Sequence, residues 1–516
     1  MKIERTKNAS RNMVFGVILR CHQIIIPFLM RTAMLYMMGV QYLGLNSLFT
    51  SLLQVLNLAE LGVGSAMIYS MYRPIAEDNQ TQICALLRLY RLYYRIIGLA
   101  VLGLGLLFLP FLPALVKSDV PNDLSLTILY LLNLGATVLT YWLFAYRTSL
   151  LQAHQREDLV SKVGLITSSI QYFLQLLVII FLKNYYLYLT VSLVTQVLNN
   201  IIVALVSKRI YPEYKPQGSL SKESRADINQ RIRDLFTAKL GGVIVNSADT
   251  IVISAFLGLT ALAVYQNYFF IISAVTSFIA IIFAACTAGI GNSLVVETPQ
   301  KNYRDLQKFT FIIVWISGFC ACCFLCLFQP FMRLWVGSEL MLDFGAVICL
   351  CIYFFVYEIN QMLNMYKDAS GIWHKDRFRP LTTALSNLFL NLLLVNHWGI
   401  YGVILSTVLS TVFVGMPWLL HNLFTHIFNT GNLKGYLSTF FKYIIVVILC
   451  CALTYLICTC IPLTGIPEIV TKLLICLFIP NTAFFLVYRK TQEFVDAVLL
   501  LAKMTNGRLD LSRIMK

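Results

Sequence analysis

Hydrophobic positions recur along this chain in runs of about twenty residues, and charged positions gather in the segments between them. Each run is apolar all round, which predicts a helix that crosses a bilayer, since about 20 helical residues span the hydrocarbon core. The strands of a transmembrane barrel would instead alternate polar and apolar residues over about ten positions. The pattern therefore predicts an all-α polytopic membrane protein.

We expect fourteen transmembrane helices, with boundaries accurate to about four residues. The predicted spans are 13–39, 44–70, 92–113, 124–146, 161–182, 186–207, 236–257, 262–290, 309–330, 344–366, 380–396, 399–421, 439–460 and 468–488. The connections on one side of the membrane are basic, and those on the other side are short and carry little charge.

The basic residues set the orientation. Of the 40 Lys and Arg residues, thirty-four fall on the side that holds both termini, four fall on the opposite side, and two lie inside the first span. By the positive-inside rule both termini are cytoplasmic. The net charge of +16 is then a topology signal with some attraction for anionic lipid, and it requires no nucleic-acid partner.

Six spans precede a charged connection and six follow it, and the two halves are weakly alike. MRTAMLYMMGVQYLGLNSLF (30–49) aligns with ADTIVISAFLGLTALAVYQNYF (248–269), so that Arg31 falls opposite Asp249 and Gly39 opposite Gly258. Both halves start in the cytoplasm, which predicts two six-helix lobes related by a pseudo-twofold axis along the membrane normal. Two further helices follow the repeat.

This repeat predicts the organisation of the chain. We expect an N-terminal six-helix lobe at 1–210, a cytoplasmic linker at 211–235, a C-terminal six-helix lobe at 236–430, two additional helices at 431–490 and a cytoplasmic tail at 491–516. In the tail, EFVDAVLLLAKM (493–504) is typical of an amphipathic helix at the inner membrane surface.

Several stretches resemble the polysaccharide flippases of the multidrug/oligosaccharidyl-lipid/polysaccharide exporter superfamily. They are FLMRTAMLYMMGVQYLGLNSLF and its continuation (28–79), YRLYYRIIG (90–98), SADTIVISAFLGLTALAVYQNYFFI (247–271) and GIGNS (289–293). The resemblance implies a flippase that moves undecaprenyl-diphosphate-linked oligosaccharide units by alternating access, for capsular or exopolysaccharide synthesis in a bacterial plasma membrane. It implies a central cavity lined by cations, and as partners the lipid-linked oligosaccharide, membrane lipids and other polysaccharide-assembly proteins.

The first span contains Arg20, His22 and Arg31. An arginine near mid-bilayer costs about 2.5–3.5 kcal/mol or more on insertion scales, so this helix must face protein or water. Eleven residues turn a helix by three turns plus about 20°, which places both arginines on one face, about 16 Å apart. We interpret them as cavity cations for a moving anionic headgroup; the alternatives are pairing with Glu60 or Asp249, or snorkelling of Arg31. His22 points elsewhere and is expected to be packed or hydrogen-bonded.

Other charged residues extend this hypothesis. Lys239, at the mouth of the seventh span, could mirror Arg20 in the second lobe or serve as a positive-inside anchor. The intramembrane acids are coupling or gating candidates, or members of static helix–helix bonds, because an isolated carboxylate in a membrane is expensive. They are Glu60, Asp249 and Glu358. Basic residues near the inner surface could recruit a diphosphate at the entrance or act only as topology charges; these are Arg88, Arg91, Arg95 and Arg147.

The sequence contains no constellation typical of catalysis. There is no phosphate-binding Gly-rich loop, and neither the six histidines nor the fourteen cysteines have the spacing of a metal site, so we expect no cofactor, no metal and no enzyme activity. Most cysteines lie in apolar runs and are interpreted as small hydrophobic residues. Two other functions stay open: a cation-coupled drug antiporter of the same superfamily and, less favoured, a membrane polysaccharide polymerase.

Overall fold

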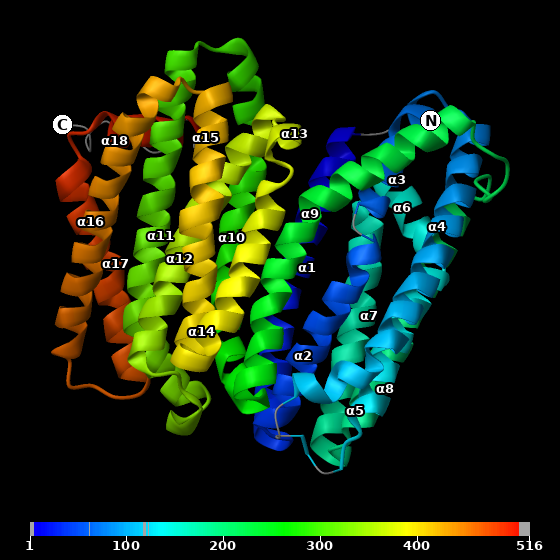
Figure 1. The fold of residues 1–516 in the computed structure, drawn as a ribbon, viewed down its shortest axis with the longest axis horizontal. Coiled ribbons are helices and arrows are strands. Elements are labelled where there is room, and N and C mark those ends of the chain that lie inside the picture. Colours follow the sequence, from blue (N-terminus) through cyan, green and yellow to red (C-terminus); the bar gives the residue numbers. More distant parts are fainter. Residues whose placement is uncertain (1–4, 61, 117–119, 122, 505–516) are drawn as a thin grey trace. The chain divides into compact units, whose positions relative to one another are not determined.

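The computed structural model describes residues 5–504 apart from residues 61, 117–119 and 122, and helices are the regular elements of that part of the chain. Contacts divide the chain into two compact units, Met1–Ala263 and Val264–Lys516. Most of the long helices of the first unit run alongside one another (Figure 1). They are α1 (Arg5–Met37), α2 (Val40–Leu56), α3 (Val63–Ala76), α4 (Gln80–Phe108), α5 (Leu126–Trp142), α6 (Ala145–Ala153), α7 (Glu157–Leu177), α8 (Tyr185–Ile210) and α9 (Lys222–Leu257).

The unit boundary falls in α10 (Leu259–Val296), most of which belongs to the second unit. The other helices of that unit are α11 (Pro299–Trp335), α12 (Phe344–Ser370), α13 (Trp373–Asp376), α14 (Arg379–Ser410), α15 (Met416–His426), α16 (Leu433–Thr459), α17 (Ile466–Tyr488) and α18 (Gln492–Met504). Short 3₁₀ or π turns flank them at η1 (Asn57–Glu60), η2 (Leu109–Leu115), η3 (Val178–Leu182), η4 (Ser338–Leu340), η5 (Thr411–Gly415) and η6 (Thr430–Asn432).

Several helices begin at the capping residues that the sequence places between apolar runs. The side chains of Asn79, Ser221, Thr298 and Asp343 accept hydrogen bonds from backbone N–H groups in the first turns of α4, α9, α11 and α12. Each of these bonds satisfies an N–H group that has no partner within its own helix. Polar residues in the connections thus fix where the membrane-spanning helices start.

The all-helical membrane fold is confirmed, but the count of fourteen spans is not. In the described part of the chain eleven helices are long and apolar enough to cross a membrane, or twelve if α5 and α6, bent by 52°, form one span. One of the eleven runs from Trp373 to His426. The difference from our prediction has two structural origins, at Gly399 and between α2 and α3.

Gly399 reverses the chain within α14. Its φ of 55° and ψ of −130° are not helical, and the Asn387 side-chain amide donates to the Thr407 hydroxyl at 2.8 Å. In a straight helix twenty residues would separate these groups by about 30 Å. The segments on either side of Gly399 therefore pack against each other, which agrees with the two separate spans predicted around residue 397.

The second predicted span, 44–70, is wrong as a continuous helix. The chain ends α2 at Leu56, forms η1, and starts α3 after Gly62, whose φ is 87°. A Cβ atom at Gly62 would also lie 2.7 Å from Cβ of Leu235 in α9. Glycine therefore permits both the left-handed backbone and the close approach of a second helix, which a hydropathy pattern does not reveal.

The predicted linker is only partly a loop. Residues 211–221 form turns and bends but no helix, whereas residues 222–235 form the first part of α9. Contacts group α9 with the first unit, where it packs on α2 and α3. The two contact-defined units are not the same as the two six-helix lobes, which remain a prediction from the sequence repeat.

Aromatic packing holds the last helices of the second unit together. The ring of Trp315 on α11 stacks on Phe484 of α17 at 5.5 Å and on Phe494 of α18 at 6.0 Å. Its indole N–H donates to Asn481 at 2.7 Å. The predicted amphipathic helix therefore exists as α18, but its apolar face packs on protein; residues 505–516 of the predicted tail lie outside the described residues.

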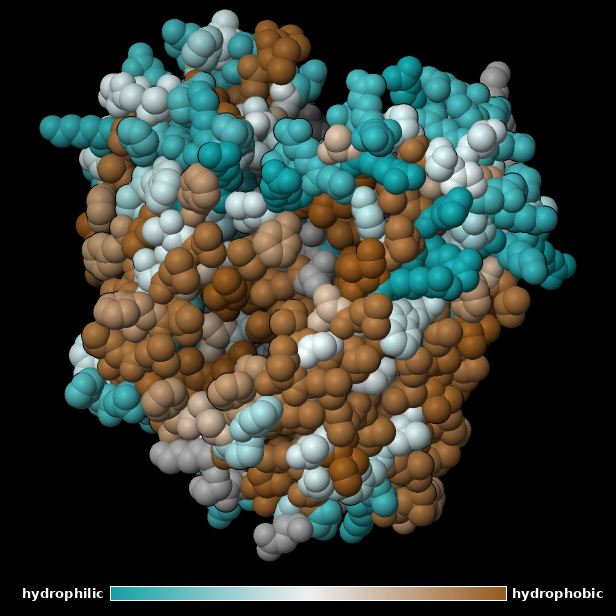
Figure 2. Space-filling view, turned by 45° about the vertical axis from the view of Figure 1, so that its right-hand side comes forward, coloured by the Kyte–Doolittle hydropathy of each residue, from teal (hydrophilic) through white to brown (hydrophobic). Residues whose placement is uncertain are grey.

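Figure 2 shows how hydropathy is distributed over one face of the molecule. Hydrophobic side chains cover the middle of this face, and hydrophilic side chains gather along its upper part and in smaller patches at its lower edge. The exposed large hydrophobic residues include Leu104, Leu107, Ile166 and Phe173 in the first unit and Ile445, Leu449 and Phe478 in the second. Such exposure suits hydrocarbon surroundings and would be unusual over so wide an area in a water-soluble protein.

Candidate functional site

The first helix places its polar residues in different surroundings. Arg20 has an exposed side chain, although α1 is apolar around it. Arg31 is partly buried and interacts electrostatically with Tyr188 of α8. His22 Nε2 lies 3.0 Å from the Ser169 hydroxyl of α7, so the expectation of a hydrogen-bonded histidine is confirmed. Arg20 is therefore exposed, whereas Arg31 and His22 contact neighbouring helices of the first unit.

Glu60 ends a chain of hydrogen-bonded hydroxyl groups. Tyr94 donates to Glu60 Oε1, and Tyr141 donates to Oδ1 of the neighbouring Asn57 at 2.8 Å. Tyr90 donates to Tyr94 at 3.0 Å, and Ser149 of α6 donates to Tyr90 at 2.9 Å. The sequence indicated Glu60, but the hydroxyl groups come from α4, α5 and α6, and no spacing along the chain connects them.

The two predicted residues of α9 lie in different surroundings within the first unit. Lys239 Nζ donates to Ser65 Oγ of α3 at 3.2 Å, and its side chain is exposed. Asp249 of the same helix is 8% exposed. It lies two residues after Ser247, which is fully buried. Ser247 belongs to the contact of α9 with α2, in which its hydroxyl donates to the Gln54 side-chain oxygen at 3.5 Å.

Glu358 lies at a cavity within the second unit. Its side chain is 1% exposed, and its Oε1 atom has no hydrogen-bond partner among the described residues. The cavity has a volume of about 210 Å³ and is walled by α10 and α12. Its polar and aromatic lining consists of Thr276, Phe283, Thr287, Tyr357, Glu358, Gln361, Asn364 and Asp368. Carboxylate, amide and hydroxyl oxygens of this kind are suited to a hard cation or a proton.

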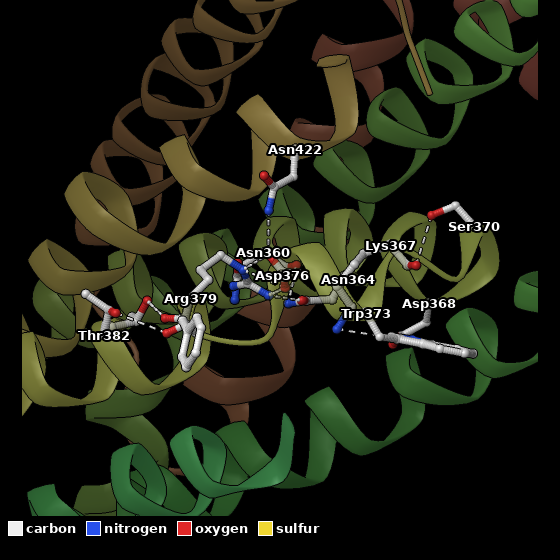
Figure 3. A network of polar contacts seen from close by, with 12 residues as sticks. Asn360, Asn364, Lys367, Asp368, Ser370, Trp373, Asp376, Arg379, Thr382 and Asn422 are labelled. Atoms are coloured by element: carbon white, nitrogen blue, oxygen red, sulfur yellow. Dashed lines mark hydrogen bonds and ion pairs between the residues drawn. The ribbon is translucent and has the colours of Figure 1, made fainter. Parts of the chain in front are cut away.

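A buried ion pair supports one wall of this cavity (Figure 3). Arg379 binds both carboxylate oxygens of Asp376, with Nε–Oδ1 at 2.8 Å and Nη2–Oδ2 at 2.7 Å. Asn422 of α15 donates to Asp376 at 3.0 Å, and Arg379 donates to the Asn364 side-chain oxygen at 2.8 Å. The pair thus orients an amide that lines the cavity.

Sequence reasoning missed this ion pair because Arg379 was counted as a topology charge. The one available signal was the i, i+3 spacing of Asp376 and Arg379, which brings opposite charges together on a helical turn. Both residues are buried, and their further partners Asn364 and Asn422 come from α12 and α15, of which α15 is distant in sequence.

The four expected entrance residues lie on two helices. Arg88, Arg91 and Arg95 lie on α4 with exposed side chains, and Arg88 donates to the Gly218 carbonyl at 2.9 Å. Arg147 on α6 is instead 8% exposed, with Nη1 lacking a hydrogen-bond partner in the described part of the chain. The exposed arginines share one helix, and Arg147 is a separate buried charge.

These elements define a multi-pass membrane protein whose charged and amide side chains lie within apolar helices. The sequence pattern of the polysaccharide biosynthesis proteins matches residues 9–288, and the chain belongs to that family. No curated protein matches the sequence.

Solved structures share the fold. The lipid II flippase MurJ in an inward closed conformation aligns with a TM-score of 0.64 and 14% identity, over 93% of this chain and 98% of its own. An inward-facing multidrug resistance MATE family transporter of the MOP superfamily aligns with a TM-score of 0.61 and 14% identity, over 83% and 99%. A MOP superfamily transporter from Pyrococcus furiosus has a TM-score of 0.53 and 14% identity, over 83% and 96%. The chain therefore shares the fold of these flippases and exporters.

Proposed function

We propose that this protein is a flippase that moves undecaprenyl-diphosphate-linked oligosaccharide units across a bacterial plasma membrane for surface polysaccharide synthesis. Membership of the polysaccharide biosynthesis family and a fold similar to a lipid II flippase support this class of substrate. Both findings favour a lipid-linked sugar over a soluble one as the substrate.

The exposure of Arg20 is the observation that carries the proposal. A guanidinium group exposed to hydrocarbon would be costly, so Arg20 faces water or a polar headgroup. Arginine binds diphosphate oxygens through paired N–H donors, which suits an anionic headgroup better than a cationic drug. Arg31, on the same helix, and Lys239 would form further contacts as the headgroup moves.

The transport cycle follows from these roles. The diphosphate approaches the exposed arginines of α4 and binds at Arg20, while the lipid tail stays in the bilayer and the glycan occupies a wet cavity. Rocking of the two lobes then exposes the headgroup to the outer leaflet. An inside-negative membrane potential favours outward movement of negative charge by about 2.3 kcal/mol per charge per 100 mV.

Glu358 is the proposed coupling group in the second unit. Its carboxyl group lies at a cavity of about 210 Å³ together with Asn364 and Gln361, where a proton or a small cation would satisfy its oxygen. Glu60 and Asp249 would act as gating or coupling groups in the first unit. Binding of the cation and of the lipid diphosphate to different conformations would couple the two movements.

Reconstitution of the purified protein tests this function directly. Proteoliposomes would contain the lipid diphosphate oligosaccharide, and the sugar would be measured in the outer leaflet with an impermeant sugar-modifying enzyme. We expect protein-dependent exposure of sugar that began in the inner leaflet, faster with a membrane potential of the favourable sign. Equal exposure in protein-free vesicles would contradict the proposal.

A cation-coupled drug antiporter is the second candidate, and the cavity at Glu358 favours it. Phe283 and Tyr357 line this cavity beside the carboxyl group, and aromatic rings with an acid suit an organic cation. Proton- or sodium-driven uptake of a cationic dye, abolished by Glu358→Gln, with no movement of the lipid-linked sugar would establish the antiporter instead.

A further inference from the structure

Cysteines gather on three helices that pack against one another in the second unit. Eight of the fourteen cysteines lie on α11, α16 and α17. These helices contact each other in all three pairings. Spacing along the chain gave no indication of a metal site, because the thiols that meet belong to different helices.

Four of these thiols form one cluster. The Sγ atoms of Cys326, Cys458 and Cys476 all lie within 4.8 Å of one another, and the three side chains are buried. Cys323, one helical turn before Cys326, packs against these three side chains. Each of the three helices therefore contributes at least one sulfur atom.

This arrangement is close to that of a thiolate metal centre. Two sulfur atoms bound to one tetrahedral zinc ion at about 2.3 Å lie about 3.8 Å apart, so adjustments of about 1 Å would bring the thiols into position. Sulfur ligands select thiophilic cations such as Zn²⁺ and Cu⁺ over hard cations. Each thiol that binds would release its proton to solvent.

The surroundings fit a charged centre. Lys472 lies one turn before Cys476 on α17 and forms an ion pair with Glu468 at 2.7 Å. Four thiolates carry more negative charge than a single metal ion neutralises. The nearby ammonium group of Lys472 would offset part of the remaining charge. Tyr455 and Ile475 pack against the cluster and limit access of water.

We propose that Cys323, Cys326, Cys458 and Cys476 form a binding site for one thiophilic metal ion, which ties α16 and α17 to α11. The sequence repeat predicts that these two helices stand outside the two lobes, and the ion would fix them to α11 within the second unit. The site is independent of the proposed transport function and requires no lipid-linked substrate.

Metal binding to the purified full-length protein tests this site. Protein reduced and kept under inert gas in detergent would be titrated separately with Zn²⁺, Cu⁺ and Co²⁺. We expect about one tightly bound Zn²⁺ or Cu⁺ per chain, and a sulfur-to-metal charge-transfer absorption with Co²⁺. The separate titrations identify which ion binds more tightly.

Serine variants locate the ligands. Cys476→Ser and Cys458→Ser should weaken metal binding about tenfold or more, whereas Cys349→Ser, a buried thiol of α12 outside the cluster, should leave it unchanged. Size-exclusion profiles would identify the variants that fold. Because Cys323 is only partly buried, Cys323→Ser should disturb the packing less than the other two substitutions. Absence of stoichiometric metal binding, binding unchanged by all three cluster variants, or a disulfide between two of the four cysteines in anaerobically isolated protein would overturn the proposal.

Discussion

The Tyr94 hydroxyl donates a hydrogen bond to the Glu60 carboxylate, and this contact joins the middle of α4 to the break between α2 and α3. An acid at a helix break is thereby held within a network of aromatic hydroxyl groups. Tyr90 continues the network, with its ring perpendicular to that of Tyr94 at 4.6 Å.

Removing this hydroxyl should destabilise the first unit. Tyr94→Phe leaves Glu60 with one donor fewer, and we expect the free energy of unfolding in detergent to fall by about 1–3 kcal/mol. Glu60→Gln keeps an acceptor oxygen and should cost less. Tyr72→Phe, at an exposed position, is the control, and a loss for Tyr94→Phe no larger than the control's would contradict the assignment.

Breaking the buried ion pair of the second unit should have a larger effect. Asp376→Asn leaves Arg379, which is 5% exposed, without its charge partner, and we expect a loss of about 3–5 kcal/mol in unfolding free energy. Glu77→Gln in the exposed Arg73–Glu77 pair serves as a control and should leave unfolding nearly unchanged. Similar small effects of both substitutions would show that Asp376 is not buried as described.

The reversal at Gly399 predicts a specific sensitivity at Gly402. A Cβ atom there would lie 2.5 Å from the Leu394 backbone carbonyl oxygen, so Gly402→Ala should lower the unfolding free energy by about 1–3 kcal/mol. Gly103 on α4 has no heavy atom within 4 Å of such a Cβ, and Gly103→Ala should stabilise by up to about 1 kcal/mol. Thermal unfolding of both variants would compare them, and a tolerated alanine at 402 would refute the tight turn.

His154 should make stability depend on pH. It follows α6, outside the membrane spans, and its ring lies 4.2 Å from that of Tyr211. Burial lowers the pKa of His154, although the Leu150 carbonyl and the nearby Glu213 and Asp78 act in the opposite direction. The unfolded chain then binds the proton more readily, so the stability contributed by neutral His154 is complete above about pH 6.5 and declines below it.

Unfolding measured between about pH 5 and 7 checks this sign, because ordinary carboxylates stay ionised there. We expect the wild type to lose stability as pH falls and His154→Gln to lose less. An equal slope for both proteins would assign the pH dependence to other groups.

The sequence predicted most helices, because a bilayer demands long apolar runs and short polar connections. It also predicted the turn near residue 397, at which Gly399 reverses the chain. It failed between α2 and α3, where the run stays apolar but Gly62 has a left-handed backbone. Local hydropathy carries no information about such a break.

The candidate site was less predictable than the fold. Arg20, Glu60 and Glu358 are visible in sequence as charges within apolar runs, since a membrane makes such residues rare. The Asp376–Arg379 pair and the thiol cluster depend on which helices become neighbours. That tertiary information is absent from residue spacing along a single helix.

Flipping by Arg20 variants tests the central claim most directly. In the leaflet-accessibility assay with the lipid diphosphate oligosaccharide, Arg20→Ala should lose at least about tenfold in rate, equivalent to one charge-assisted contact of about 1.5–3 kcal/mol. Arg20→Lys should retain part of the rate, and Arg73→Ala, an exposed arginine near the end of α3, should match the wild type. Wild-type flipping by correctly inserted Arg20→Ala protein would contradict the role of Arg20 as the diphosphate-binding cation.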